Sequence, residues 1–333
     1  MERRDFLRIS ASTMVSAVAG SVGLMTWTPR AHAITVAKTF YILQGNIAQP
    51  DGVSVHFKGF SDTTSSLRVP AASFIVQEGD TLTITVRNTL STSHSWVING
   101  VFDSGTIAGG QTKTFSFPAP KAGSYFFYDK LNAPYNRLVG LHGAMAVMPA
   151  GSANTLYSGS PTFKKQLFWI FNDIDPVWHD RIRQGLTPTT TFVPRYFTLN
   201  GKSSRPPGAT GYNDPNINSM YDPATAIEGY IGDRTLIRIF NAGQCTHSMH
   251  WHANHVEWLT ENGSKRPSIW LKDVVRLDNN MGRTDVIFPF DPPPDAYPPV
   301  TMGHYVMHLH DEQTQTAGGG LYQFGAQAGI KFK

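Results

Sequence analysis

Two distant segments of this 333-residue chain carry the same pattern of glycine, acid and alternating apolar residues. Glu78–Asn88 has the sequence EGDTLTITVRN, and Ile231–Asn241 has the sequence IGDRTLIRIFN. In each copy a histidine follows six residues after the asparagine, at His94 and His247. Landmarks that recur in the same order indicate two copies of one structural unit. The chain is therefore expected to fold as two similar halves.

Short apolar runs bounded by turn residues predict the secondary structure of each half. Alternating or apolar runs of this kind cover residues 74–76, 82–86, 115–117, 125–128, 236–240, 285–288 and 305–307. Such runs predict strands, and many short strands predict an all-β fold of sandwiches. The single cysteine, Cys245, excludes an intramolecular disulfide, so each sandwich must be held together by its core.

The repeat predicts a first sandwich over residues 34–150 and a second over residues 195–333. Residues 151–194 are predicted to connect them, with a strand at Gln166–Phe171. Ser203–Pro223 is rich in glycine, proline and asparagine and predicts a long surface loop.

The N-terminus has the features of an export signal. Arg3 and Arg4 precede Phe-Leu-Arg, a weakly apolar run follows, and Ala31-His-Ala33 supplies a small-residue cleavage site. Residues 1–33 are therefore predicted to be a twin-arginine (Tat) signal peptide, which implies a periplasmic or secreted protein. No later segment is apolar for the ~18 residues of a membrane span, so none is expected after cleavage.

The charge of the remaining chain excludes one class of partner. Of 28 bases and 24 acids, four bases and two acids lie in residues 1–33, which leaves 24 bases against 22 acids. So small an excess, without lysine or arginine clusters, predicts no nucleic-acid binding.

Seven of the twelve histidines lie near the C-terminal end. One string is His247-Ser-Met-His250-Trp-His252-Ala-Asn-His255, and a second is His308-Leu-His310, with His304 nearby. Imidazole is a preferred ligand of copper and zinc, so the strings predict a metal site. Residues two apart on a strand share a face, so 250 with 252, and 308 with 310, present pairs of imidazoles, whereas His247 and position 309 face the other way.

These strings resemble those of the multicopper oxidases, which include laccases, ascorbate oxidase and two-domain bacterial relatives built from cupredoxin sandwiches. The family carries a His-Pro-x-His-x-His string and a later His-Cys-His string. The resemblance implies two cupredoxin-like Greek-key β-sandwich domains. It implies that His247 holds type 1 copper, that His250 is a type 2 ligand, and that His252, His308 and His310 are type 3 ligands.

Departures from the family pattern limit the expected chemistry. The four type 1 positions fall on His247, Leu309, Thr314 and Gly319, and a leucine cannot supply the thiolate of a blue copper site. Cys245 is a weak substitute, more simply explained as a small buried side chain. Standard four-electron laccase activity is therefore not expected.

The first half lacks the family's other ligands. By the repeat, its two His-x-His strings fall on Val97–Gly100 and on Tyr128-Asp-Lys130, which contain no histidine. The isolated His94 and His142 are weak ligand candidates, more simply read as hydrogen-bonded structural histidines. Tyr128 or Asp129 is the remaining group that could reach a metal.

The predicted function is thus a copper-dependent oxidoreductase with a histidine-only site in the second sandwich. His250, His252, His308 and His310 form its core, and His247, His255 and His304 are further candidates. Copper is the expected cofactor, in an unspecified number of ions, with zinc as the alternative. The expected reductant is a small molecule or a metal ion. Two-domain relatives often form trimers with the trinuclear site between subunits. Because the first half lacks its ligands, that reason for a trimer is absent here, and a homo-oligomer such as a trimer is left open.

Two other functions remain open. A copper-free envelope scaffold or chaperone would explain the missing ligands of the first half. Copper storage or delivery would use Met249, Met302 and Met307, which lie near the histidines in the sequence.

Overall fold

The computed structural model describes residues 27–204, 218–220, 222–293, 303–315 and 325–333. The first 26 residues of the predicted signal, most of the predicted 203–223 loop, Met302 and Gly319 lie outside these ranges. None of the helices within them is long and apolar enough to cross a bilayer.

The first sandwich consists of two sheets, in the orders β2-β1-β4-β7 and β3-β9-β8-β5-β6. Its elements are β1 Thr35–Ala48, β2 Ser54–Ser61, β3 Phe74–Gln77, β4 Thr81–Asn88, β5 Val97–Ile98, β6 Phe102–Asp103, β7 Thr112–Pro118, β8 Gly123–Tyr128, α1 Tyr135–Leu138 and β9 His142–Met148. An aromatic core that includes Phe40, Trp96 and Phe127 fills the space between the sheets.

The second sandwich has the sheet orders β11-β10-β13-β18-β15-β16 and β12-β20-β19-β14-β17. Its elements are β10 Lys165–Ile174, α2 Pro176–Arg183, β11 Tyr196–Leu199, β12 Ile227–Gly229, β13 Thr235–Asn241, β14 His247–Trp251, β15 Val256–Glu261, β16 Ser264–Lys272, β17 Val274–Leu277, β18 Arg283–Phe288, β19 Gly303–Leu309, the 3₁₀ helix η1 Glu312–Gln315 and β20 Gln327–Phe332.

The pairing of the strands reproduces the internal repeat. β4 lies between parallel β1 and antiparallel β7, as β13 lies between parallel β10 and antiparallel β18. β8 pairs with β9 and β5, as β19 pairs with β20 and β14. The predicted all-β fold of two sandwiches is confirmed, and every predicted apolar run lies in a strand.

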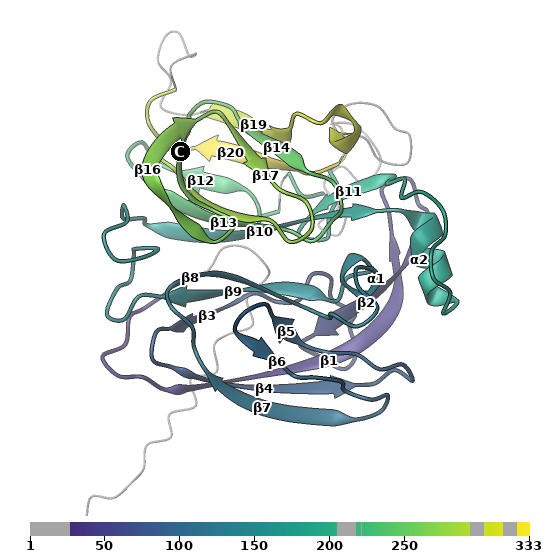
Figure 1. Ribbon diagram of the computed structural model, residues 1–333. Helices are drawn as coiled ribbons and strands as arrows, with labels where there is room; N and C mark the ends of the chain where they lie inside the picture. Colours follow the sequence, from purple (N-terminus) through teal and green to yellow (C-terminus); the bar gives the residue numbers. More distant parts are fainter. Residues whose placement is uncertain (1–26, 205–217, 221, 294–302, 316–324) are drawn as a thin grey trace, which may run out of the picture.

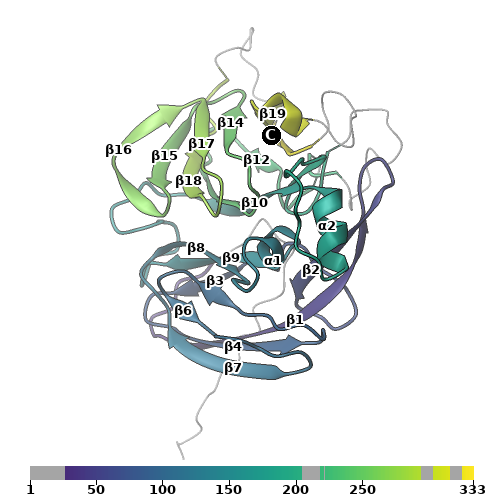
Figure 2. The same ribbon diagram turned by 45° about the vertical axis from the view of Figure 1, so that its right-hand side comes forward.

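The segment 151–194 is more than the connection that the sequence predicted. β10 pairs in parallel with β13, so it is a strand of the second sandwich, which therefore begins before residue 195. α2 follows, and its N-cap Asp175 accepts hydrogen bonds from the backbone of Val177 and Trp178. The helix lies beside β2 of the first sandwich (Figures 1 and 2).

One sheet of each sandwich faces the other through an apolar interface. Phe126 of β8 stacks on Phe240 of β13, with ring centroids 6.0 Å apart. Beside this contact lies the fully buried Arg238, which donates to Gln166 Oε1 at 2.9 Å and, across the interface, to Ser124 Oγ at 2.9 Å. Ser124 in turn donates to the buried carboxylate of Asp285.

We expect the substitution Arg238→Met to lower the free energy of unfolding by about 3–5 kcal/mol, because it leaves Asp285 buried without a nearby cation. Arg87→Met is the matched control, since Arg87 is an exposed arginine of the equivalent strand β4. Its effect should stay within about 0.5 kcal/mol. Urea unfolding followed by tryptophan fluorescence measures both values. Equal effects of the two substitutions would contradict the structural role given to Arg238.

Candidate metal centre

Strand register sorts the C-terminal histidines onto one face of the sheet β12-β20-β19-β14-β17. His250 of β14 lies directly opposite His308 of β19, and Met249 lies opposite Leu309. Met249 and Leu309 are fully buried between the two sheets of the sandwich, whereas His250 and His308 lie on the outer face. The first sandwich packs against the other sheet, so the histidine face is turned away from it (Figure 1).

Four imidazoles meet on this outer face. Ligand atoms of His250, His308 and His310 all lie within 4.8 Å of one another. The Nε2 atom of His252 lies 3.2 Å from the Nε2 atom of His308. The structure therefore brings together all four histidines that the sequence placed at the core of the site.

The geometry of these rings fits a metal ion. Two imidazole nitrogens at about 2.0 Å from one tetrahedral ion stand roughly 3.3 Å apart, close to the observed separation of His252 and His308. The Nδ1 atom of His308 lies 3.2 Å from the Leu309 carbonyl oxygen and donates to it, so the Nε2 lone pair faces His252. The Nδ1 atom of His250 is buried and makes no hydrogen bond within the described part of the chain.

The local environment keeps two of these rings neutral at pH 7. Burial, together with the neighbouring imidazoles, lowers the pKa of His308 to about 4. Burial and the charges of His252 and His310 also lower the pKa of His250. Neutral rings carry the lone pairs that metal coordination requires.

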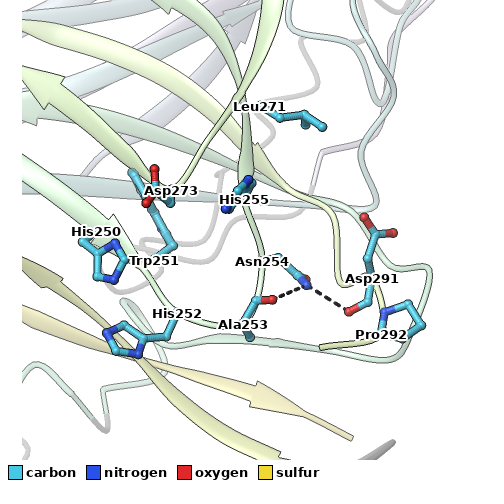
Figure 3. Close-up of a pocket in the computed structure, with 10 residues that line it drawn as sticks. All are labelled: His250, Trp251, His252, Ala253, Asn254, His255, Leu271, Asp273, Asp291 and Pro292. Atoms are coloured by element: carbon cyan, nitrogen blue, oxygen red, sulfur yellow. Dashed lines mark hydrogen bonds between the residues drawn. The ribbon is translucent and has the colours of Figure 1, made fainter. Parts of the chain in front are cut away.

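A pocket of about 500 Å³ opens beside the cluster (Figure 3). His250 and His252 lie on one side of it, and Asp291 lies on the opposite side. His255 and Asp273 also line the pocket. The cluster is therefore accessible to a small molecule.

His255 and His304 lie outside the group of three imidazoles that could share an ion. His255 is exposed and borders the pocket. His304 is exposed and lies opposite Lys331, four residues before His308, which is roughly 13 Å along an extended strand. Among the further candidates, His255 is therefore nearer to the cluster's pocket.

His247 lies in a separate, buried pocket, as strand alternation predicts. Its Nε2 atom lies 3.0 Å from Asp173 Oδ1, and its Nδ1 atom lies 3.6 Å from Asp311 Oδ2, too far for a hydrogen bond. Burial favours the neutral ring, but the two carboxylates outweigh it and raise the pKa of His247 to about 9. Carboxylates thus stand on both sides of this ring where the resemblance implies a copper ion.

The other type 1 positions offer no thiolate. Burial raises the pKa of the Cys245 thiol to about 12, and Asp173 adds to this effect. Leu309 is packed in the core, and Thr314 is buried with its hydroxyl donating to the Asp311 carbonyl. Gly243 allows the backbone to approach Asp173 closely, because a Cβ atom there would lie 2.2 Å from Oδ2. The site is built around a carboxylate.

The first sandwich contributes nothing to the histidine cluster. Nδ1 of His94 lies 2.6 Å from Asp129, and Nε2 lies 2.9 Å from Thr92. His142 is buried and donates from Nδ1 to the Arg137 carbonyl at 2.8 Å. Tyr128 donates its hydroxyl to Asn99. Both weak ligand candidates, His94 and His142, and the possible ligands Tyr128 and Asp129 thus lie apart from the four imidazoles and have other partners.

Comparison with known proteins agrees with this architecture. Residues 61–152 match the sequence model of the multicopper oxidase family. Residues 61–152 thus have the sequence features of a multicopper oxidase domain. The match falls on the first sandwich, although the histidine strings that suggested the family lie in the second. A comparison with curated protein sequences gave no significant match.

Solved multicopper oxidases and a copper nitrite reductase share the fold over most of their length. The multicopper oxidase mgLAC is 23% identical, with a TM-score of 0.69 over 90% of this chain and 86% of its own. The blue copper oxidase of Nitrosomonas europaea is 20% identical, with a TM-score of 0.69 over 89% and 85%. The copper nitrite reductase of the same organism is 18% identical, with a TM-score of 0.65 over 90% and 94%. At these identities the likeness establishes the fold.

Sequence reasoning missed three carboxylates that lie at these sites, Asp173, Asp273 and Asp291. Asp173 follows Asn172 near the end of β10 and is the single acid of this buried strand, which was the available signal. Asp273 and Asp291 lie in segments without a pattern that connects them to the histidines, and only the folded chain brings them to the pocket.

The His247–Asp173 pair predicts a specific dependence of stability on pH. Because the pKa of His247 is raised above its unfolded value, its contribution is complete below about pH 6.5 and is lost as pH rises through about 9. The free energy of unfolding should fall by up to about 1.4 kcal/mol per pH unit across this window.

Urea unfolding between pH 6 and 10 measures this slope. In Asp173→Asn the same window should show a much smaller slope, because the main source of the raised pKa is removed. Burial would raise the pKa of Asp173, but the His247 charge and backbone donors hold it below its usual value, so the pair is also lost at acidic pH. An unchanged slope in the variant would contradict the ion pair.

Proposed function

We propose that this chain is an exported copper protein whose second sandwich binds copper through His250, His252, His308 and His310. The 3.2 Å approach of His252 to His308, beside the three-imidazole group, is the observation that carries this proposal. The multicopper oxidase domain and the copper-oxidase fold favour copper over zinc. Zinc stays the alternative because an all-imidazole site accepts both ions.

The proposed reaction class is a simple copper-dependent oxidation of a small molecule or a metal ion. Copper bound here would supply one-electron redox chemistry. His250 and His308 hold neutral donor nitrogens toward the site. Asp273 and Asp291 place carboxylates in the adjoining pocket, where they can attract a cationic reductant or accept a proton from it. No type 1 centre takes part, because His247, Cys245 and Leu309 together do not provide the ligands that a type 1 copper requires.

The positions of the methionines argue against copper storage or delivery. Met249 and Met307 are fully buried on the core side of β14 and β19, opposite the histidines. They cannot share an ion with the four imidazoles without disruption of the core. A copper-free scaffold stays the competing function, and metal content separates it from the oxidoreductase.

We expect the purified protein to retain copper, as measured by elemental analysis and paramagnetic resonance. His250→Ala or His308→Ala should raise the dissociation constant for copper by about 10²-fold or more, because even the loss of a residue supporting a ligand costs 10–100-fold. Oxidation of a phenolic or metal-ion reductant should fall in parallel. These rings lie on the outer face of the sheet, so thermal unfolding should change little.

His304→Ala is the matched control, since it removes an exposed histidine of the same strand outside the cluster. It should leave copper affinity unchanged. The copper-free scaffold would be favoured if the protein retained neither copper nor zinc and if its activity were unchanged by His250→Ala, His308→Ala and His304→Ala.

Export can be tested through the twin arginines. Arg3→Lys combined with Arg4→Lys should retain the protein in the cytoplasm, whereas Arg8→Lys should be exported, because a Tat signal requires the arginine pair. Fractionation of bacterial cells measures the distribution, and the exported chain should begin at Ile34. The backbone nitrogen of Ile34 lies 3.0 Å from the buried carboxylate of Asp80, which could pair with the new amino group. Equal export of both variants would refute the signal.

A further inference from the structure

A second group of reactive side chains lies in the first sandwich, far from the histidine cluster. The hydroxyl of Thr92 lies 2.9 Å from Nε2 of His94. Nδ1 of the same ring lies 2.6 Å from Oδ2 of Asp129. Hydroxyl, imidazole and carboxylate in this order, each within hydrogen-bond reach of the next, form the arrangement that activates a nucleophilic hydroxyl.

The direction of these hydrogen bonds follows from Asp129. Its Oδ1 accepts from the backbone and hydroxyl of Ser95 and from the backbone of Leu131, and its Oδ2 accepts from Asn136 at 2.8 Å. The carboxylate therefore acts as an acceptor, and Nδ1 of His94 donates to it. Nε2 then carries a lone pair, and the Thr92 hydroxyl donates to it.

The support around this group is rigid. Asp129 and His94 are fully buried. Asn88, at the end of β4, donates to the Thr92 carbonyl at 2.7 Å and so fixes the loop that presents the hydroxyl. Thr92 itself is exposed. A reactive atom is thus accessible while the groups that would activate it are shielded from water.

Thr92 and His94 line a cavity of about 380 Å³ between the first sandwich and the end of α2. This volume is within the range of small-molecule sites. Lys58 lies on the wall of this cavity and is only 7% exposed. Burial lowers the pKa of Lys58, although the Asp129 charge partly offsets this. In its protonated form, Lys58 would stabilise an oxyanion that forms in the cavity.

We propose that Thr92, His94 and Asp129 form a hydrolytic site for small carboxylic esters, distinct from the metal centre. Thr92 Oγ1 attacks the ester carbonyl carbon while its proton passes to Nε2 of His94. The carbon–oxygen bond to the alcohol then breaks, and the leaving alkoxide takes that proton. Water, deprotonated by His94, then attacks the acyl carbon. The bond from this carbon to Thr92 Oγ1 breaks, the acid is released, and His94 returns the proton to Oγ1. The sum is ester plus water to acid plus alcohol.

A fluorophosphonate probe and p-nitrophenyl acetate hydrolysis test this site in the full-length protein, with and without prior removal of metal by a chelator. We expect mass spectrometry to locate the phosphonyl adduct on Thr92. Thr92→Val should abolish the adduct and reduce hydrolysis to the buffer rate, whereas Thr92→Ser should keep both. His94→Gln should slow hydrolysis by about 10²-fold or more through loss of the general base.

Ser93→Ala is the matched control, because it removes the neighbouring exposed hydroxyl and leaves Thr92 in place. Labelling and hydrolysis should be unchanged in this variant and in metal-stripped protein. Because Thr92 is exposed, Thr92→Val should fold normally, which thermal unfolding checks. An adduct on another residue, no adduct, or equal hydrolysis by Thr92→Val and the wild type would overturn the proposal.

Discussion

The register in which β14 pairs with β19 determines which side chains of the second sandwich enter its core and which form the metal site. Alternation along each strand sends Met249, Trp251, Met307 and Leu309 into the core. Trp251 stacks on Trp169 of the facing sheet at 6.4 Å, which anchors β14. A shift of one residue would expose this core and bury the imidazoles, so apolar burial fixes the register that gathers the histidines.

Equivalent loops of the two sandwiches place a histidine beside a buried carboxylate, but the surroundings of the two histidines differ. Asn88 and Asn241 occupy the same place in the repeat, and each ties down the loop before a histidine by donating to a carbonyl, of Thr92 or of Cys245. Each histidine then contacts a buried carboxylate, Asp129 or Asp173. Asp129 follows β8 and Asp173 lies in β10, so the two loops are alike but their carboxylates come from different parts of the fold.

Much of the fold could be predicted from the sequence because its signals are local. Alternating runs predicted the strands, and the repeat predicted two sandwiches. The role of β10 could not be predicted in this way, because its partner β13 is distant in the chain and the segment between them carries no repeat signal. The helix α2 was missed although Asp175-Pro176 is a typical helix start.

The candidate site was predictable to the extent that it depends on spacing. A spacing of two residues along a strand was sufficient to predict that His250 pairs with His252 and that His308 pairs with His310. The partners of His247 were not predictable, because Asp173 lies 74 residues earlier in the chain and only the packing of β10 beside the β14 loop brings it near. The same limit applies to the carboxylates that border the pocket.

In the proposed site, imidazoles from two neighbouring strands share one ion without a thiolate. X-ray absorption spectroscopy of the copper-loaded protein tests this arrangement most directly, because the spectrum reports the donor atoms and their distances. We expect three or four imidazole nitrogens at about 2.0 Å from copper and no sulfur neighbour. A short copper–sulfur distance, or copper held mainly by carboxylate oxygens in the His247 pocket, would contradict it.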